Sequence, residues 1–181
     1  MVAQINTKMF TPDIHHRHSI RLKNYDYSSP GMYFVTIVVQ HRAELFGSVS
    51  NGQLHLNTTG EMVKLEWLSL PNRFPNIGID VFVVMPNHFH GIIAIYPYEN
   101  RTTTMAAPTL GGIIGAFKSI TTTQYIAGVK NLGWEQFDTR LWQRNYWDHI
   151  IRNEEDLMEI REYIHNNPLQ WMDDDLHPQN S

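Results

Sequence analysis

The most apolar stretches of the chain are short and rich in β-branched and aromatic residues, which is typical of strands. Residues 32–40 (MYFVTIVVQ) are apolar at nearly every position, as expected of a central strand that is covered on both faces. Residues 77–85 (IGIDVFVVM) predict a second strand, which Pro86-Asn87 interrupts before residues 88–96 predict a third. The pattern therefore indicates neighbouring strands, two of them joined by a short turn.

Two shorter stretches predict a β-hairpin of their own. Residues 45–49 and 53–56 flank Asn51-Gly52, and this dipeptide is the strongest short signal for a two-residue hairpin turn. Asparagine and glycine both tolerate the positive φ angles that such a turn requires. We therefore expect a short antiparallel pair between the first strand and the first helix.

Three stretches place apolar residues at helical spacing. The first begins with a capping-box motif at Thr58 and is expected to end at Pro71, because proline cannot continue the helical hydrogen bonds. The second covers residues 110–127. The third follows the N-cap residue Asn153 and stops before Pro168. Short antiparallel strands mixed with three helices predict an α+β fold, a single domain in which helices pack on a sheet.

The composition excludes several kinds of protein. The chain has 181 residues, a length typical of one domain, and 42% of them are hydrophobic, which is enough for a packed core. No cysteine occurs, so disulfide scaffolds, thiolate zinc sites and cysteine nucleophiles are excluded. No apolar run approaches the roughly 20 residues that span a bilayer, and the N-terminus lacks the apolar core of a signal peptide. A cytoplasmic protein without a membrane partner is expected.

The net charge of −4 is unevenly distributed along the chain. Residues 151–181 carry two arginines against eight acidic residues, whereas the rest of the chain is slightly basic. Residues 1–28 form a polar, basic lead-in, which either steers an anionic ligand or is only a solvated tail. We expect residues 29–171 to form the domain. Residues 172–181 are expected to form an acidic C-terminal tail, which repels DNA, covers a site or only adds solubility.

The most informative motif is a pair of histidines within MPNHFHGII. On a strand, side chains two positions apart point to the same face, so His88 and His90 share a face while Phe89 points to the other. Two imidazoles placed in this way can bind one divalent cation through neighbouring ring nitrogens. A hydrogen-bonded structural pair is the alternative, and spacing alone does not decide, since another His-x-His occurs in the polar lead-in.

The last predicted helix carries a second group of polar residues, in the sequence REYIHNNP. Tyr163 and Asn167 are four residues apart and are therefore neighbours on one face of the helix. A phenol with a reference pKa of about 10 attacks poorly at neutral pH unless a base or a cation assists it. An amide oxygen is a good ligand for hard cations. The simpler interpretation is that Tyr163 packs at the helix end and Asn167 caps it.

Three motifs with these residues occur in order along the chain. They are the His-hydrophobic-His motif in VVMPNHFHGII, the sequence WQRNYWDHIIR at residues 142–152, and YIHNNP at residues 163–168. This combination resembles the REP-associated tyrosine transposases, relatives of the small insertion-sequence transposases in the single-tyrosine HUH nuclease superfamily. The likeness runs from about His16 to Trp171, and three ordered motifs are far more specific than one His-x-His.

The resemblance implies a ferredoxin-like (RRM-like) antiparallel sheet with helices packed on it, and both histidines on a central strand. His88, His90 and Asn167 match the family's ligands for a divalent metal, Mg²⁺ or Mn²⁺. Tyr163 matches the catalytic nucleophile of the family. Tyr146 is a rival, but we expect it to be structural, since only Tyr163 is followed by a suitably spaced polar ligand.

The implied activity is cleavage and rejoining of single-stranded DNA that carries a hairpin, such as a palindromic repeat. A Tyr163 phenolate would form a 5′-phosphotyrosine linkage and free a 3′-hydroxyl, and another 3′-hydroxyl would reverse the step without ATP. A domesticated hairpin-binding module that has lost turnover is the alternative. A small-molecule phosphodiesterase is disfavoured, because a third histidine and carboxylate ligands are missing from the motif. We expect a monomer rather than a dimer.

Several basic and aromatic residues are candidates for DNA contacts. The basic residues that can touch the DNA backbone are Arg17, Arg21, Lys23, Lys118, Arg144 and Arg152. Trp142 and Trp147 can stack on unpaired bases. For each of these residues taken alone, core packing or a solvated charge is the alternative.

Overall fold

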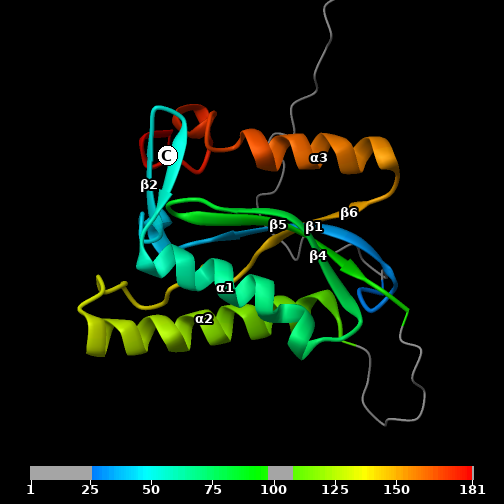
Figure 1. Cartoon of the computed structure of the whole chain (residues 1–181), viewed down its shortest axis with the longest axis horizontal. Helices are drawn as coiled ribbons and strands as arrows, with labels where there is room; N and C mark the ends of the chain where they lie inside the picture. Colours follow the sequence, from blue (N-terminus) through cyan, green and yellow to red (C-terminus); the bar gives the residue numbers. More distant parts are fainter. Residues whose placement is uncertain (1–25, 98–107, 181) are drawn as a thin grey trace, which may run out of the picture.

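The computed structural model describes residues 26–97 and 108–180, and its centre is a four-stranded sheet in the order β4-β5-β1-β6 (Figure 1). The strands are β1 (Gly31–Val38), β4 (Ile77–Val84), β5 (His88–Ile95) and β6 (Trp147–Ile151). Every neighbouring pair is antiparallel, and the strand order makes β5 and β1 the central strands. The predicted DNA contacts Arg17, Arg21 and Lys23 lie outside the described residues.

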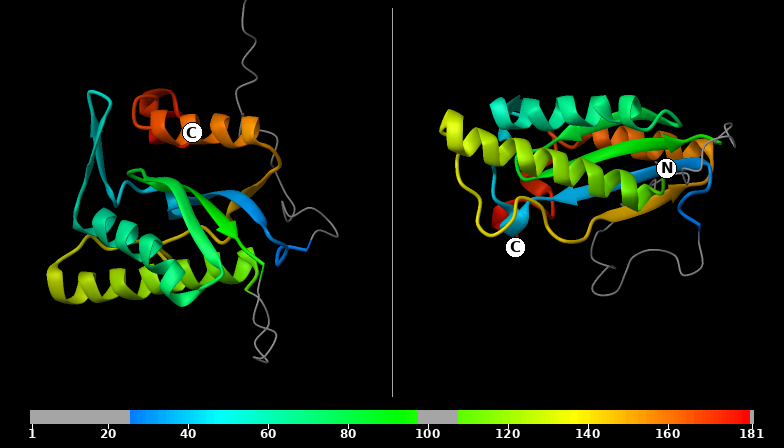
Figure 2. Two further views of the ribbon diagram at one scale, coloured as in Figure 1. Left: turned by 45° about the vertical axis from the view of Figure 1, so that its right-hand side comes forward. Right: turned by 90° about the horizontal axis from the view of Figure 1, so that it is seen from below.

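Helices cover both faces of this sheet. α1 (Thr58–Arg73) and α2 (Leu110–Leu132) lie side by side on one face, and α3 (Glu154–Asn166) lies on the other (Figure 1; Figure 2). The chain order β1, α1, β4, β5, α2, β6 combined with this strand order is the ferredoxin-like arrangement, so the predicted α+β fold is confirmed. Among the described residues, no helix has the length and apolar character needed to cross a bilayer.

The alternation along β5 decides which side chains face each helix layer. Phe89 points into the main core beneath α1 and α2, where the Trp67 ring lies against it with centroids 4.5 Å apart. Ile92 points the other way and packs with residues of α3. Because side chains alternate along a strand, His88 and His90 share the α3 face with Ile92. The predicted placement of both histidines on one face of a central strand is therefore observed.

A separate hairpin of β2 (Gly47–Ser50) and β3 (Gln53–Leu56) extends away from the sheet (Figure 2). Asn51 and Gly52 form its turn with φ angles of 53° and 72°, so the predicted turn is confirmed. A Cβ on Gly52 would lie 2.8 Å from Leu169 Cδ2. The tip of the hairpin therefore packs against the turn that follows α3.

Helix α1 differs from the prediction at both ends. Its N-cap is Asn57 rather than Thr58, because the Asn57 side chain accepts hydrogen bonds from two backbone N–H groups of the first turn. Pro71 lies inside the helix, which continues to Arg73. The missing N–H of a proline affects only one helical bond, and the buried side chain of Leu70 anchors the last turn in the core.

Helix α2 is longer than the predicted range of residues 110–127, because Gly128 does not interrupt it. The Trp134 ring packs on the helix at Gly128, so closely that a Cβ there would overlap the ring. The helix ends at Leu132, and Gly133 adopts the left-handed conformation with a φ angle of 71°. Gly128 therefore allows the Trp134 ring to lie close to the helix, and Gly133 is the residue that ends the helix.

The sequence pattern does not predict strand β6, whose five residues are all only partly buried. It forms an edge of the sheet by pairing with β1, with Trp147 opposite Thr36 and His149 opposite Phe34. A strand this short is defined by the partner on which it packs more than by its own residues. The pairing with β1 therefore makes this segment a strand.

Candidate active site

Two buried imidazoles lie side by side on the α3 face of the sheet. His88 and His90 are at most 2% exposed, and their ring centroids lie 4.5 Å apart. His88 Nδ1 lies 2.8 Å from Asn87 Oδ1, and His90 Nδ1 lies 2.8 Å from the Thr36 hydroxyl on β1. Each imidazole therefore contacts a neighbouring polar group through Nδ1, which leaves Nε2 for the site.

The end of α3 brings a phenol and an amide to these imidazoles. The Tyr163 hydroxyl lies 3.3 Å from His90 Nε2, and the Tyr163 ring stands edge-on to Phe34 of β1 with centroids 6.0 Å apart. Asn167, four residues later, is 1% exposed. The structure thus brings together the four residues that the motifs singled out, from a central strand and the last helix: His88, His90, Tyr163 and Asn167.

Apolar packing and the contact between Arg161 and Asp80 help to hold α3 in this position. Leu157 and Ile164 are the buried residues of α3, and they pack in the second apolar cluster between this helix and the sheet. Arg161 makes a bidentate contact with Asp80 of β4, with Nε 3.1 Å from Oδ1 and a terminal nitrogen 2.6 Å from Oδ2. The hydrogen bonds from Arg161 lower the pKa of Asp80 below its usual value. These contacts fix the helix turn that carries Tyr163.

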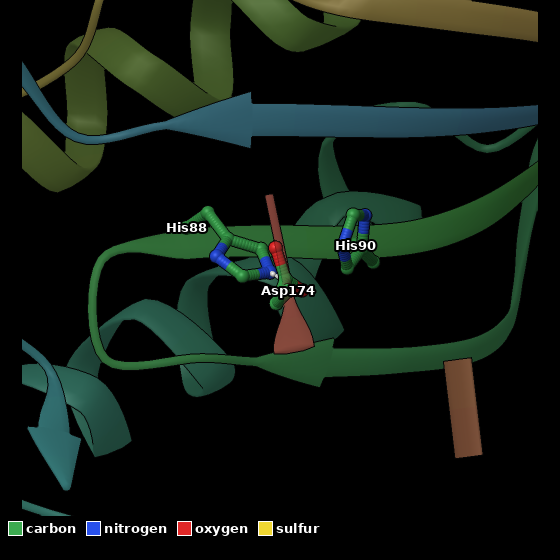
Figure 3. A group of neighbouring side chains, drawn as sticks. All are labelled: His88, His90 and Asp174. Atoms are coloured by element: carbon green, nitrogen blue, oxygen red, sulfur yellow. Dashed lines mark ion pairs between the residues drawn. The ribbon is translucent and has the colours of Figure 1, made fainter. Parts of the chain in front are cut away.

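A carboxylate that the sequence motifs do not identify lies in the same cluster. Asp174 Oδ2 accepts a hydrogen bond from Asn167 Nδ2 at 3.1 Å and lies 3.9 Å from His88 Nε2 (Figure 3). The ligand atoms of His88, His90 and Asp174 all lie within 4.8 Å of one another. Asp174 is the middle one of three consecutive aspartates, so no signal in the sequence distinguishes it from its neighbours.

Asp174 belongs to the C-terminal segment, residues 167–180, which is packed on the domain. Arg42 donates a hydrogen bond to the Asp175 carbonyl at 2.9 Å. Asn87 Nδ2 donates to the Leu176 carbonyl at 2.7 Å. These contacts of the Asp175 and Leu176 carbonyls hold the segment on the domain, with Asp174 beside the imidazoles.

Two buried acceptors of the cluster have no hydrogen-bond partner, His88 Nε2 and Asn167 Oδ1. A buried polar atom left unpaired costs about 1–3 kcal/mol, and a cation bound between these atoms would satisfy both. The donors available are imidazole nitrogens, an amide oxygen and a carboxylate oxygen, a mixed set that suits a divalent cation such as Mn²⁺. The residues present therefore fit a divalent metal.

Burial controls the protonation of the cluster. It lowers the pKa of His88 to about 4, although the Asp174 carboxylate opposes this shift. Burial and the neighbouring His88 also lower the pKa of His90. Burial raises the pKa of Tyr163, and the negative charges of Asp174 and Asp175 raise it further. At neutral pH the imidazoles are therefore neutral, the form that binds metals, and the phenol is protonated.

Two of the basic candidates for DNA contacts, Lys118 and Arg152, lie away from this cluster. Lys118 is half-buried and donates to two backbone carbonyls of the loop before β6, at 3.0 and 2.9 Å. Burial lowers the pKa of its ammonium group to about 8. Arg144 and Arg152 are exposed. Arg152 precedes α3, so about 15 Å of helix separates it from Tyr163.

The aromatic candidates divide between the core and the site. Trp142 is 4% exposed, and its Nε1 donates to a buried hydroxyl of α2 at 2.9 Å, so it belongs to the core. Tyr146 packs against the same core, on the face of the sheet opposite the imidazoles. Trp147 is only partly buried and lies opposite Thr36, on the face that carries His90. Trp147 is therefore the tryptophan that remains available near the site.

The fold and the cluster define the class: a ferredoxin-like α+β protein with two strand histidines facing a tyrosine at a helix end. No family model matches the chain. An uncharacterized protein of Haemophilus influenzae is 43% identical over an alignment that covers 94% of this chain and 98% of that protein, and the chain belongs to its family. A protein of the same organism named "Putative REP-associated tyrosine transposase" is 24% identical over 82% of this chain and 77% of its own length.

A solved structure shows the same fold. A REP-associated tyrosine transposase bound to a REP hairpin matches 86% of this chain and 74% of its own, with a TM-score of 0.56 and 20% sequence identity. The chain is therefore similar in fold, and distantly in sequence, to the REP-associated tyrosine transposases, as its motifs indicated.

Proposed function

We propose that this protein is a metal-dependent single-stranded DNA nuclease and strand transferase, which cleaves hairpin-bearing DNA through a 5′-phosphotyrosine intermediate. One observation carries the proposal: a phenol at the end of the last helix lies 3.3 Å from an imidazole of the central strand. The REP hairpin bound to the solved transposase supports hairpin DNA as the substrate class. Cleavage and rejoining explain why a nucleophile and a set of metal donors occur together.

The metal donors come from three parts of the chain. His88, His90 and Asn167 would hold the cation, and the Asp174 carboxylate is a further donor within reach. The unpaired acceptors His88 Nε2 and Asn167 Oδ1 support this assignment. When bound, Mg²⁺ or Mn²⁺ supplies a Lewis acid that polarises a non-bridging phosphate oxygen and favours the phenolate.

Tyr163 supplies the nucleophile. Its oxygen forms a bond to phosphorus while the bond from phosphorus to the 3′-oxygen breaks, and the phenolic proton is balanced by the proton that the leaving 3′-oxygen gains. One phosphodiester replaces another, so a second 3′-hydroxyl reverses the step on a new strand without ATP. The contacts of α3 with β4, Arg161 with Asp80, hold the hydroxyl beside the imidazoles during this exchange.

Covalent capture tests the proposal. The protein incubated with a single-stranded hairpin oligonucleotide and Mn²⁺ is expected to form an adduct that survives denaturation. Tyr163→Phe should remove the adduct and leave folding and hairpin binding intact, because only the hydroxyl is lost. Tyr146→Phe is the matched control and should retain the adduct. An adduct in Tyr163→Phe that is missing in Tyr146→Phe would show that Tyr146 is the nucleophile.

A hairpin-binding module without turnover is the second candidate, and the environment of Tyr163 favours it. Burial and two aspartates raise the phenol pKa, and Asp174 lies close to His88. This candidate predicts hairpin binding without an adduct in Mg²⁺ or Mn²⁺, and binding that survives His88→Ala. A denaturation-resistant adduct with the wild-type protein excludes it.

A further inference from the structure

Asn87 immediately precedes β5, and its side chain is fully buried between three segments of the chain. Its Nδ2 donates to the Leu176 carbonyl at 2.7 Å and to the Arg42 carbonyl at 3.2 Å. Both partners are carbonyl oxygens, which can only accept hydrogen bonds. The two carbonyls therefore fix the orientation of the amide, with the nitrogen toward them and the oxygen on the opposite side.

The orientation of this amide determines where the proton of the neighbouring imidazole lies. Asn87 Oδ1 lies 2.8 Å from His88 Nδ1, and an amide oxygen can only accept. His88 Nδ1 must therefore carry the hydrogen that it donates to Asn87. In the opposite tautomer two lone pairs would face each other in a buried site, and the proton would lie on Nε2.

Because the hydrogen of neutral His88 lies on Nδ1, the lone pair of Nε2 points into the cluster. His88 Nε2 is buried without a hydrogen-bond partner and lies 3.9 Å from Asp174 Oδ2. We propose that Asn87 is a positioning residue that holds neutral His88 as the Nδ1–H tautomer and so presents Nε2 to a divalent cation. The tautomer follows from the geometry alone, whereas the use of Nε2 as a ligand rests on the proposed function.

His90 shows why Asn87 differs from an ordinary polar neighbour. The His90 Nδ1 atom faces the Thr36 hydroxyl at 2.8 Å, and a hydroxyl can either donate or accept. Thr36 is therefore compatible with both tautomers of His90. Asn87 permits only one tautomer of His88, because its donors are already used by carbonyls of two distant segments.

The first test measures the tautomer directly in the metal-free protein. Long-range ¹H–¹⁵N NMR distinguishes a protonated ring nitrogen from an unprotonated one, and His88→Gln assigns the His88 signals by their loss. We expect a protonated Nδ1 and an unprotonated Nε2 for His88. A protonated Nε2 in the wild-type protein would overturn the proposal.

The second test measures Mn²⁺ affinity by calorimetry, without DNA. Asn87→Leu should weaken Mn²⁺ binding by roughly 10–100-fold, the usual effect of losing a group that orients a metal-ligating histidine. The matched control is Asn76→Leu, because Asn76 is also a buried asparagine directly before a strand but contacts Tyr96 instead of a histidine. It should bind Mn²⁺ as the wild-type protein does.

If a folded Asn87→Leu variant binds Mn²⁺ with wild-type affinity, Asn87 is not a positioning residue for His88. If that variant does not fold, the tautomer of the wild-type protein still decides the proposal. Neither measurement involves DNA or the Tyr163 hydroxyl. A protein that shows the expected tautomer and Mn²⁺ affinities but forms no adduct would refute the proposed function alone.

Discussion

Burial sets the charge states of three residues in the cluster, His88, His90 and Tyr163. The imidazoles of His88 and His90 are neutral because charging them would require removing an ion from water, and for His88 this cost exceeds the attraction of Asp174. Protons therefore do not compete with a metal for these nitrogens near neutral pH. The same burial raises the pKa of Tyr163 and keeps its phenol protonated.

Stability should fall in mild acid because of His88, whose pKa is about 4 in the folded protein and near 6.5 when unfolded. Between these values the unfolded chain binds more protons, so the free energy of unfolding decreases as the pH falls below 6.5. From pH 6.5 to 5 the expected loss from this residue is about 2 kcal/mol. Urea unfolding with EDTA present at several pH values measures it.

His88→Gln removes this titration and should make the pH dependence shallower, while buried His90 keeps its own contribution. His165→Gln is the control, since His165 is exposed on α3, and it should leave the pH dependence unchanged. Equal slopes in wild-type protein and His88→Gln would mean that His88 is not buried in its neutral form. Slopes rather than absolute stabilities are compared, because glutamine in a buried site also changes packing.

At the scale of elements, α3 both packs on the sheet and carries a polar residue of the site. Its buried side chains pack on β1 and β5, while Arg161 clamps it to β4 through Asp80. Tyr163, near the C-terminal end of α3, lies between the apolar cluster and the imidazoles. A small displacement of this helix would separate the phenol from the strand, so the packing of α3 is part of the site.

The two glycines of α2 that differ most in their surroundings provide a test of its packing. Gly128→Ala should destabilise the protein by about 1–3 kcal/mol, because the added methyl group overlaps the Trp134 ring. Gly115→Ala should stabilise it by about 0.5–1 kcal/mol, because no side chain of the described residues lies within 4 Å of the new Cβ and alanine favours the helix. Urea unfolding of both variants measures this difference. Stabilisation of both would show that Trp134 does not pack on the helix.

At the scale of the whole molecule, the site exists only where three distant segments meet. The central strand β5 carries the imidazoles, the end of α3 carries the phenol and the amide, and the C-terminal segment carries a carboxylate. Asn87 connects the first and the last of these, because it contacts both His88 and Leu176. The position of the C-terminal segment and the geometry of the imidazoles are therefore coupled through hydrogen bonds.

The Asp174 carboxylate should contribute to metal binding. Asp174→Asn removes its charge with little change in shape and should weaken Mn²⁺ binding by roughly 10–100-fold, the range found for groups that support a metal site. Asp173→Asn is the matched control, because Asp173 is an exposed neighbour in the same acidic run, and it should have no effect. Titration calorimetry compares the three proteins. Unchanged affinity in Asp174→Asn would place this carboxylate outside the set of donors.

The sequence by itself determined the features that depend on local spacing. Period-two alternation placed His88 and His90 on one face of a strand, and helical spacing placed Tyr163 and Asn167 on one side of the last helix. The Asn51-Gly52 turn followed from the φ angles that these residues tolerate. The motifs in order along the chain also indicated the ferredoxin-like fold, which the strand order confirmed.

The tertiary structure alone decided which distant groups meet. Asp174 is one of three equivalent aspartates until the turns after α3 place it beside His88, and β6 is a strand only because β1 pairs with it. Lys118 is a surface cation in the sequence, but the fold directs its ammonium group to backbone carbonyls. Contacts between residues far apart in the chain leave no periodic pattern, so the complete donor set could be identified only in the folded molecule.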